Sequence, residues 1–310
     1  MRFAMTYPIL GHPSDPGLLS GAGVAEVAVA AELAGFDALG FTDHPAPSQR
    51  WLDAGGHDAF DPFVALGFAA ARTTTLRLIP NIVVLPYRNP FLVAKAGATL
   101  DRLSDGRFTL AVGTGYLKRE FAALGVEFAE RTELVDESLA VIRAIWTGDD
   151  ISFEGKHFSA RGITAHPRPV SPPPIWIGGN TGSARQRVVE HGDGWCPFAA
   201  PPALAATAGT TSLESTEALA AGITDLRRRC DAAGQDWSAL DISFTNPAGG
   251  APGEPGFEPD AYLEGLARLA ELGVTWVQVP LPGLGVRNLT EELERFRATV
   301  IDVFEQGKLR

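Results

Sequence analysis

Short runs of β-forming residues alternate with longer helical runs along almost the whole chain, and this alternation constrains the fold more than any other feature. We expect strands at residues 3–6, 38–42, 76–84, 108–113, 175–178, 194–196, 242–245 and 274–279. Helices are expected at residues 24–34, 62–71, 91–103, 131–146, 183–191, 215–233, 260–272 and 289–306. Strand–helix units that repeat in this way are typical of a closed parallel barrel.

Local signals support several of these elements. Asp61 and Pro62 stand where an N-cap and a first helical residue are favoured, and the apolar residues of 131–146 recur close to every 3.6 positions. The stretch 149–174 is less regular, and we expect a small hairpin around residues 151–158. We therefore predict an α/β fold with one domain over residues 1–310, a (β/α)8 TIM barrel with insertions at its C-terminal face.

The main rival fold is an open doubly wound sheet that binds a dinucleotide. That fold carries a G-x-G-x-x-G turn after its first strand. The nearest match here, Gly113-Thr114-Gly115-Tyr116, has only the first two glycines. The barrel is therefore favoured, and barrel chemistry lies at the carboxyl ends of the strands.

Charge and composition exclude several classes of protein. A net charge of −11 and a pI near 5.0 oppose nucleic-acid binding. The sequence has neither a membrane-spanning apolar run nor the apolar core of a secretory signal, so we expect a cytoplasmic protein with no membrane partner. Two cysteines make no disulfide framework, and the six histidines lack metal-ligand spacing, so no metal site is expected. We expect Cys196 to be a buried apolar residue.

The second predicted strand ends in Asp43 and His44. At a barrel rim this pair would place an imidazole in the pocket, with a carboxylate nearby to influence its tautomer, and histidine is the natural acid or base at neutral pH. The alternative is that His44 only anchors a loop through hydrogen bonds.

Small residues follow the fourth and fifth predicted strands. Gly113 and Gly115 allow a ligand to approach the backbone closely, or they form a tight turn. Gly178, Gly179, Asn180, Thr181 and Ser183 precede a helix, where free backbone N–H groups and the helix dipole favour a phosphate. The alternative is ordinary capping by Thr181 or Ser183.

These strand ends, taken in order, resemble the bacterial luciferase-like monooxygenase superfamily, including its deazaflavin-dependent oxidoreductases. The resemblance covers roughly residues 36–196. Its carriers are Phe41-Thr42-Asp43-His44, Arg88-Asn89-Pro90, Leu100-Asp101-Arg102-Leu103-Ser104-Asp105-Gly106-Arg107, Val112-Gly113-Thr114-Gly115-Tyr116-Leu117 with Glu120-Phe121 and Leu124-Gly125, Pro167-Arg168-Pro169-Val170, Pro173-Pro174-Ile175-Trp176-Ile177-Gly178-Gly179, and His191-Gly192-Asp193-Gly194-Trp195.

The resemblance implies a cofactor ring at the barrel mouth, beside Asp43 and His44. Beneath it, strand three would bulge at Asn81, Ile82 and Val83, with a cis peptide bond between Asn81 and Ile82. One ring edge would lie along Gly113, Thr114, Gly115 and Tyr116. The cofactor phosphate would bind at Gly178, Gly179, Asn180, Thr181 and Ser183.

The function implied is hydride transfer between coenzyme F420 and an unidentified small organic substrate. His44 would be the proton donor or acceptor, with Asp43 beside it. The F420 branch is favoured over FMN by the Asp43-His44 pair and by an arginine-rich composition typical of GC-rich bacteria. Two alternatives stay open, a reduced-FMN monooxygenase that uses O₂ and a non-catalytic flavin-binding protein.

Two departures from the family bear on the substrate. Tyr116 stands where some sugar-phosphate-oxidising relatives have a carboxylate, and no lysine occurs between residues 156 and 308, so a phosphorylated substrate is not expected. We expect loops 46–58, 196–213 and 247–259 to form the pocket, with Trp51, Trp195 and Phe198 as aromatic walls. Relatives suggest a homodimer and a separate reductase that supplies the reduced cofactor.

Overall fold

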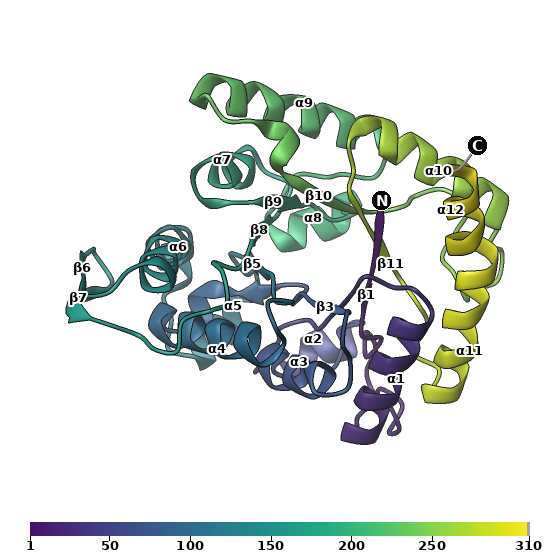
Figure 1. Cartoon of the computed structure of the whole chain (residues 1–310), viewed down its shortest axis with the longest axis horizontal. Helices are drawn as coiled ribbons and strands as arrows, with labels where there is room; N and C mark the ends of the chain where they lie inside the picture. The colour runs from purple at the N-terminus through teal and green to yellow at the C-terminus, as the bar shows by residue number, and fades with distance from the viewer. Residues whose placement is uncertain (309–310) are drawn as a thin grey trace.

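The computed structural model describes residues 1–308, so the last two residues of the domain predicted over 1–310 lie outside the described chain (Figure 1). The main sheet contains nine strands, and every neighbouring pair is parallel. Their order is β3-β2-β1-β11-β10-β9-β8-β5-β4. The strands are β1 Arg2–Thr6, β2 Ala38–Gly40, β3 Arg77–Leu78, β4 Val83–Val84, β5 Leu110–Gly113, β8 Ile175–Gly178, β9 Gly194–Cys196, β10 Asp241–Thr245 and β11 Trp276–Val279. The fold is thus α/β, with a curled parallel sheet.

The longer helices cover the outside of this sheet (Figure 1). They are α1 Gly21–Leu33, α3 Pro62–Ala70, α4 Pro90–Leu103, α6 Arg131–Thr147, α7 Gly182–His191, α9 Thr216–Ala233, α10 Pro259–Leu272 and α11 Val286–Phe296. Each contacts the next along the chain from α1 to α10, and α11 packs back against α1. A π-helical turn, Arg297–Ile301, joins α11 to α12 Asp302–Lys308; α10 contacts this turn.

Side-chain caps explain where several helices begin. The carboxylate of Asp61 accepts hydrogen bonds from the backbone N–H groups of Phe63 and Val64, which confirms it as the N-cap of α3. Thr181 caps α7 in the same manner, by accepting from Ala184 N–H. The capping alternative proposed for Thr181 from the sequence is therefore realised.

The third strand differs from the continuous segment expected at 76–84. It is interrupted between β3 and β4, and the peptide bond between Asn81 and Ile82 is cis, as predicted. Pro80 has no N–H to contribute to a ladder, and Asn81 N–H donates to the carbonyl of Phe41 beyond the end of β2. Ile79 N–H likewise donates to Leu39 of β2, so residues 79–81 stay beside the β2 segment while pairing with the β5 segment is interrupted after Leu78 and resumes at Val83.

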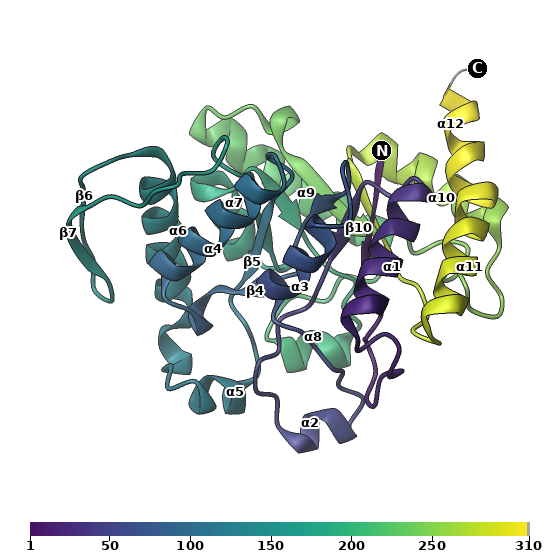
Figure 2. The same ribbon diagram turned by 60° about the horizontal axis from the view of Figure 1, so that its bottom comes forward.

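Three short helices occupy the loops that follow the strands. These helices, α2 Gln49–Asp53, α5 Lys118–Ala123 and α8 Pro202–Ala208, lie at the same end of the molecule (Figure 2). They are insertions that periodicity alone did not predict, because each is only one or two turns long. The predicted hairpin is present as β6 Ile151–Glu154 and β7 Ser159–Ile163, which pair antiparallel at the side of the molecule.

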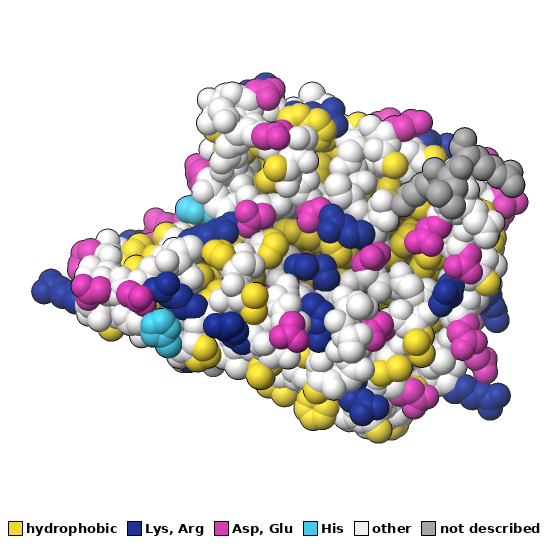
Figure 3. Space-filling view, in the orientation of Figure 1, with side chains coloured by type: hydrophobic (Ala, Val, Ile, Leu, Met, Phe, Trp, Pro, Cys, Tyr) yellow, Lys and Arg dark blue, Asp and Glu magenta, His cyan; other side chains and the backbone are white. Residues whose placement is uncertain are grey.

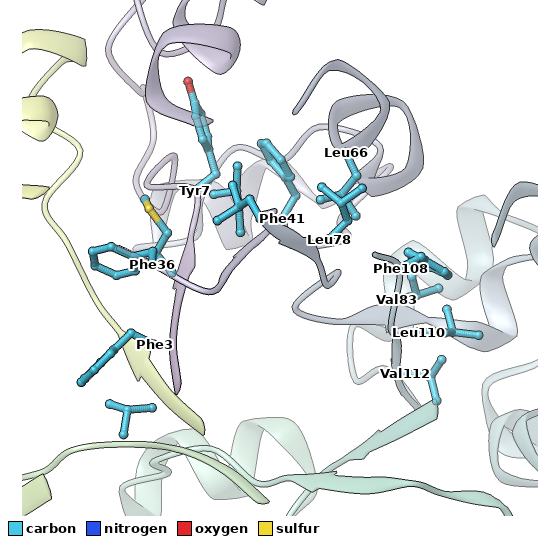
Figure 4. Packing of buried hydrophobic residues seen from close by; sticks show 14 of the residues in the cluster. Phe3, Tyr7, Phe36, Phe41, Leu66, Leu78, Val83, Phe108, Leu110 and Val112 are labelled. Carbon is cyan, nitrogen blue, oxygen red and sulfur yellow. The ribbon is translucent and has the colours of Figure 1, made fainter. Parts of the chain in front are cut away.

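Two hydrophobic clusters fill the interior. The larger lies between the sheet and its helices and includes Phe3, Phe41, Leu78 and Phe108 (Figure 4). The smaller contains Ala4, Ala38, Ile79, Ala111, Trp176, Cys196 and Trp276. In it the rings of Trp176 and Trp276 meet edge to face at 5.3 Å, so large side chains fill the space among the strands.

Acidic and basic side chains are interspersed on the face of the molecule seen in Figure 3. The acidic net charge is therefore not gathered into one large patch on this face.

Within residues 1–308, no helix is both long enough and apolar enough to cross a membrane.

Candidate active site

A cavity of about 530 Å³ opens where the strands end. Residues at or just beyond the carboxyl ends of β1, β2, β5, β8, β9, β10 and β11 line it. Parallel strands bring these ends to one face, which is why segments distant in the sequence meet here.

Most of the predicted site residues lie at this cavity. Those that line it are Asp43, His44, Asn81, Ile82, Gly113, Thr114, Gly115, Tyr116, Gly178, Gly179, Thr181 and Ser183. The structure therefore brings together residues from all four predicted strand ends.

Val83 and Asn180 are the two predicted residues that do not line the cavity. Val83 points into the large cluster, near Phe108 and Leu110 (Figure 4). The buried Asn180 side chain donates to the carbonyls of Phe198 and Thr211 and accepts from Phe198 N–H. We therefore revise both assignments, since one side chain packs in the core and the other holds the loop after β9.

His44 is paired with a carboxylate that the sequence reasoning had not selected. Its Nδ1 lies 3.1 Å from Oε2 of Glu120, which lies in the first turn of α5 and is fully buried. An ionised carboxylate is only an acceptor, so the proton lies on Nδ1 and Nε2 is left as the free nitrogen. Glu120 had appeared in the sequence only within the Glu120-Phe121 motif, without a role.

Three donors converge on the Glu120 carboxylate. Besides His44, Ala46 N–H donates to Oε1 at 2.9 Å and the Tyr87 hydroxyl donates to Oε2 at 2.8 Å. Burial by itself would raise the pKa of Glu120, but these hydrogen bonds outweigh it, so the pKa is lowered. Burial and the neighbouring Glu120 raise the pKa of Tyr87, which keeps its hydroxyl protonated as a donor.

Asp43 is occupied by contacts that position the backbone. Its carboxylate accepts two hydrogen bonds from the Arg88 guanidinium, at 2.5 and 2.9 Å, and one from Val84 N–H at 2.9 Å. Arg88 also reaches Asp61. Both oxygens of Asp43 are therefore engaged, and we revise its predicted catalytic role to one of positioning β4 and Arg88.

The bulge of strand three forms part of the cavity floor. Ile82 extends over two of the predicted glycines, since a Cβ atom on Gly113 or Gly178 would lie 2.3 or 2.7 Å from Cδ1 of Ile82. These glycines therefore leave space for Ile82. Beside the bulge, the Asn81 amide donates to the Thr6 hydroxyl at 2.7 Å.

One end of the cavity is suited to an anion. The ten-residue helix α7 begins there, and Thr181 and Ser183 line the cavity at its start. Trp195 is fully buried and is not the pocket wall that was predicted. Its indole N–H donates to the carbonyl of Gly179 and so supports this loop.

A small group of rings surrounds His44. The rings of Trp51, His57 and Tyr116 lie 4.7, 5.1 and 6.0 Å from its ring, centroid to centroid. His57 lines the cavity, and burial lowers its pKa. His57 was missed because it lies in the loop 46–58 with no motif around it.

Of the other residues and loops predicted to form the pocket, some line the cavity and others do not. Phe198 lines the cavity, whereas Trp51 is not among the lining residues and packs against the His44 ring at a tilt of 39° instead. No residue of the described loop 247–259 reaches the cavity wall, so that loop was wrongly assigned to the pocket. Cys196 does line it, and burial raises the pKa of this thiol to about 12, so it is protonated and a poor nucleophile at neutral pH.

Outside the cavity, the described residues contain one group of possible metal ligands, Glu130, Glu133 and His157. The ammonium of Lys156 lies 2.6 Å from Glu133 and 3.3 Å from Glu130. A protein cation therefore already neutralises part of this acidic group.

Comparison with known proteins places these features in a family context. Residues 1–236 match the family model described as luciferase-like monooxygenase. The F420-dependent glucose-6-phosphate dehydrogenase of Beutenbergia cavernae is 38% identical over 172 residues, which cover 54% of this chain and 49% of that protein. The chain thus matches about half the length of this curated relative.

Solved structures agree in fold at low sequence identity. The monooxygenase RslO1 from Streptomyces bottropensis superposes with a TM-score of 0.80 at 19% identity, covering 98% of this chain and 100% of that one. An F420-dependent secondary alcohol dehydrogenase, solved with an F420-acetone adduct, gives 0.73 at 17% identity, covering 97% and 98%. At these identities the likeness establishes the fold alone.

Proposed function

Because the chain belongs to the luciferase-like monooxygenase family, we propose that it is an oxidoreductase that transfers a hydride between coenzyme F420 and a small organic substrate. The observation that carries the proposal is one cavity that joins the His44–Glu120 pair, the Ile82 bulge and the beginning of α7. The similarity to F420-dependent dehydrogenases supports the same reading.

The residues of the cavity fit such a cofactor. A phosphate at the start of α7 would meet backbone N–H groups, and the Thr181 and Ser183 hydroxyls lie on the same wall. The bulge at Ile82 would support a flat ring from below. When bound, F420 supplies the hydride chemistry, and the protein supplies position and electrostatics.

In this proposal His44 is the residue that accepts or donates the proton. With Nδ1–H held by Glu120, Nε2 is free to accept the hydroxyl proton of an alcohol while its C–H hydride leaves, or to return a proton in the reverse direction. Glu120 orients the ring, and its negative charge stabilises the imidazolium that forms. Asp43 and Arg88 act indirectly, by fixing the backbone at Val84.

We propose that the sheet forms a single (β/α)8 barrel domain. On this view β3 and β4 are two halves of one strand, separated by the bulge. The bridge between Leu78 and Phe108 supports closure, because it connects the β3 end of the sheet to the segment before β5.

A side-by-side titration with F420 and with FMN, followed by fluorescence, tests the cofactor. Tight F420 binding with weak FMN binding is the expected result. The reverse preference would favour a reduced-FMN monooxygenase, and tight retention of either without turnover would favour a non-catalytic flavin-binding protein. Binding of neither would overturn the proposal.

The role of His44 is tested separately. His44→Ala should reduce turnover while F420 affinity stays within a few-fold of wild type. Unchanged turnover would remove His44 from the mechanism.

We also propose a cytoplasmic homodimer whose reduced cofactor comes from a separate reductase. The dimer is supported by exposed apolar side chains on the neighbouring helices that follow strands two and three, Val64 and Phe68 on α3 and Leu92 on α4. Sedimentation equilibrium of the purified protein tests it.

A further inference from the structure

The charged side chains of the cavity are unevenly distributed. The two arginines that line it, Arg131 and Arg187, belong to α6 and α7, beside the proposed phosphate site. Arg187 is paired with Asp136 of α6 at 2.5 Å. The Arg131 guanidinium lies over the Phe128 ring and donates to the Phe128 carbonyl. Both cations therefore lie at the end of the cavity near α7, where we propose that the cofactor phosphate binds.

The side of the cavity formed by β1, β11 and β10 is polar, and these strands contribute no charged residue to it. The neighbouring strands β1, β11 and β10 present Thr6, Gln278, Ser243 and Thr245 to it. The amide of Gln278 donates to the Ser243 hydroxyl at 3.1 Å. Hydroxyl and amide groups of this kind form hydrogen bonds with an alcohol or a carbonyl, and they do not neutralise a charge.

Apolar side chains complete this part of the wall. Leu10, which follows β1, is one of the exposed large hydrophobic residues of the protein and lines the cavity. Val279 and Pro280 lie beside Gln278 at the end of β11. Apolar side chains gathered at a cavity favour an apolar ligand surface.

A phosphate or carboxylate placed at this end would lose its hydration without gaining a cation, which is strongly unfavourable. The lining residues include no lysine, and the two arginines lie at the other end. We propose that the substrate is an uncharged alcohol, or the matching ketone or aldehyde, with apolar substituents. This inference rests on the proposed function, since it assigns the α7 end to the cofactor.

The reaction balances without a further reactant. In the oxidative direction the alcohol carbon loses a hydride, with two electrons, to the cofactor. The hydroxyl proton passes to Nε2 of His44, and the neutral carbonyl product leaves. The polar groups near Gln278 and Ser243 then hold the substrate oxygen, and the positive charge gained by His44 is balanced by Glu120.

The test uses F420-saturated protein, so that the cofactor's own anion site is already filled. Cyclohexanol, glucose 6-phosphate and inorganic phosphate are each titrated while F420 fluorescence and reduction are recorded. We expect cyclohexanol to bind and to be oxidised, with kcat/KM at least about tenfold above that for glucose 6-phosphate. Inorganic phosphate should leave the spectrum unchanged at millimolar concentrations.

Preferential binding or oxidation of glucose 6-phosphate would overturn the inference, and so would a spectral response to inorganic phosphate. Absence of any response to cyclohexanol would overturn the substrate class as well. None of these results bears on the choice of cofactor, which the side-by-side titration with F420 and FMN tests separately.

A charge variant provides a second measurement. Gln278→Lys places a cation at the neutral end and should lower the Kd for glucose 6-phosphate by roughly tenfold. The matched control Gln306→Lys, on the exposed surface of α12, adds the same charge at a residue that does not line the cavity and should have no effect. Equal behaviour of the two variants would contradict the placement of the substrate.

Discussion

Replacement of Glu120 by glutamine tests the central pair of the site. The carboxylate accepts from His44, Ala46 N–H and Tyr87, and it is fully buried. In Glu120→Gln the NH₂ group that replaces Oε2 can only donate. It would therefore donate to His44 Nδ1 and force the proton onto Nε2, the nitrogen that accepts the substrate proton in the proposed mechanism.

The size of the effect follows from the lost hydrogen bond. A hydrogen bond to a charged group contributes about 1.5–3 kcal/mol. If it is expressed in the transition state, its loss reduces kcat by roughly 10- to 150-fold. The side chain keeps its shape, so the melting temperature and the Kd for F420 should change little.

The assay is steady-state F420 reduction with the best alcohol found, together with an F420 titration and thermal unfolding of each variant. Tyr87→Phe is the matched control, because it removes one donor to Glu120 and leaves the carboxylate in place; its kcat should fall less. A Glu120→Gln protein with wild-type kcat and wild-type stability would refute the proposed orientation of His44.

Three further predictions follow from buried contacts. Gly113→Ala should destabilise the protein by about 1–3 kcal/mol and weaken F420 binding, because the new Cβ displaces Ile82; thermal unfolding and the titration measure both. Arg88→Met leaves the buried Asp43 carboxylate without its cation and should cost about 3–5 kcal/mol in urea unfolding. Burial lowers the pKa of His57 below its usual value near 6.5, so the unfolded state takes up the proton first as the pH falls. The stability contributed by neutral His57 is therefore present above that value and lost below it, and His57→Gln should unfold with a weaker acid dependence than wild type.

Each of these predictions has a control or a contrary result. Gly67→Ala in α3 meets no atom within 4 Å and should be neutral or slightly stabilising. Arg287→Met removes an exposed pair with Glu291 and should change stability by less than about 0.5 kcal/mol. If Arg88→Met is as mild as Arg287→Met, the Asp43 contact is not a major stabiliser. An unchanged acid dependence in His57→Gln would remove His57 as its cause.

The order and approximate positions of the main strands and helices were predictable because the sequence signals for them are local. Apolar periodicity and N-caps such as Asp61 act between near neighbours in the sequence. The short helices α2, α5 and α8 gave no comparable signal, since one or two turns contain too few residues for a period. The interruption of strand three was expected only through family resemblance.

The site was predictable in outline for a related reason. Once parallel strands are assigned, their carboxyl ends must meet, so His44, Gly113 and Thr181 were expected to lie together. The roles of Asp43 and Asn180 were not predictable. Their partners, Arg88 and the loop after β9, are set by how the loops fold back over the strand ends.

The sequence by itself determined the alternation of strands and helices, the positions of the strand ends and the residue types available there. These depend on backbone preferences and on contacts a few residues apart. Only the tertiary structure decided that Glu120, 76 residues further along the chain, would hold the ring of His44. It also decided that the arginines of the cavity would gather at one end. Such pairings are set by long-range packing, because a buried carboxylate is tolerated only where the fold brings enough donors to it.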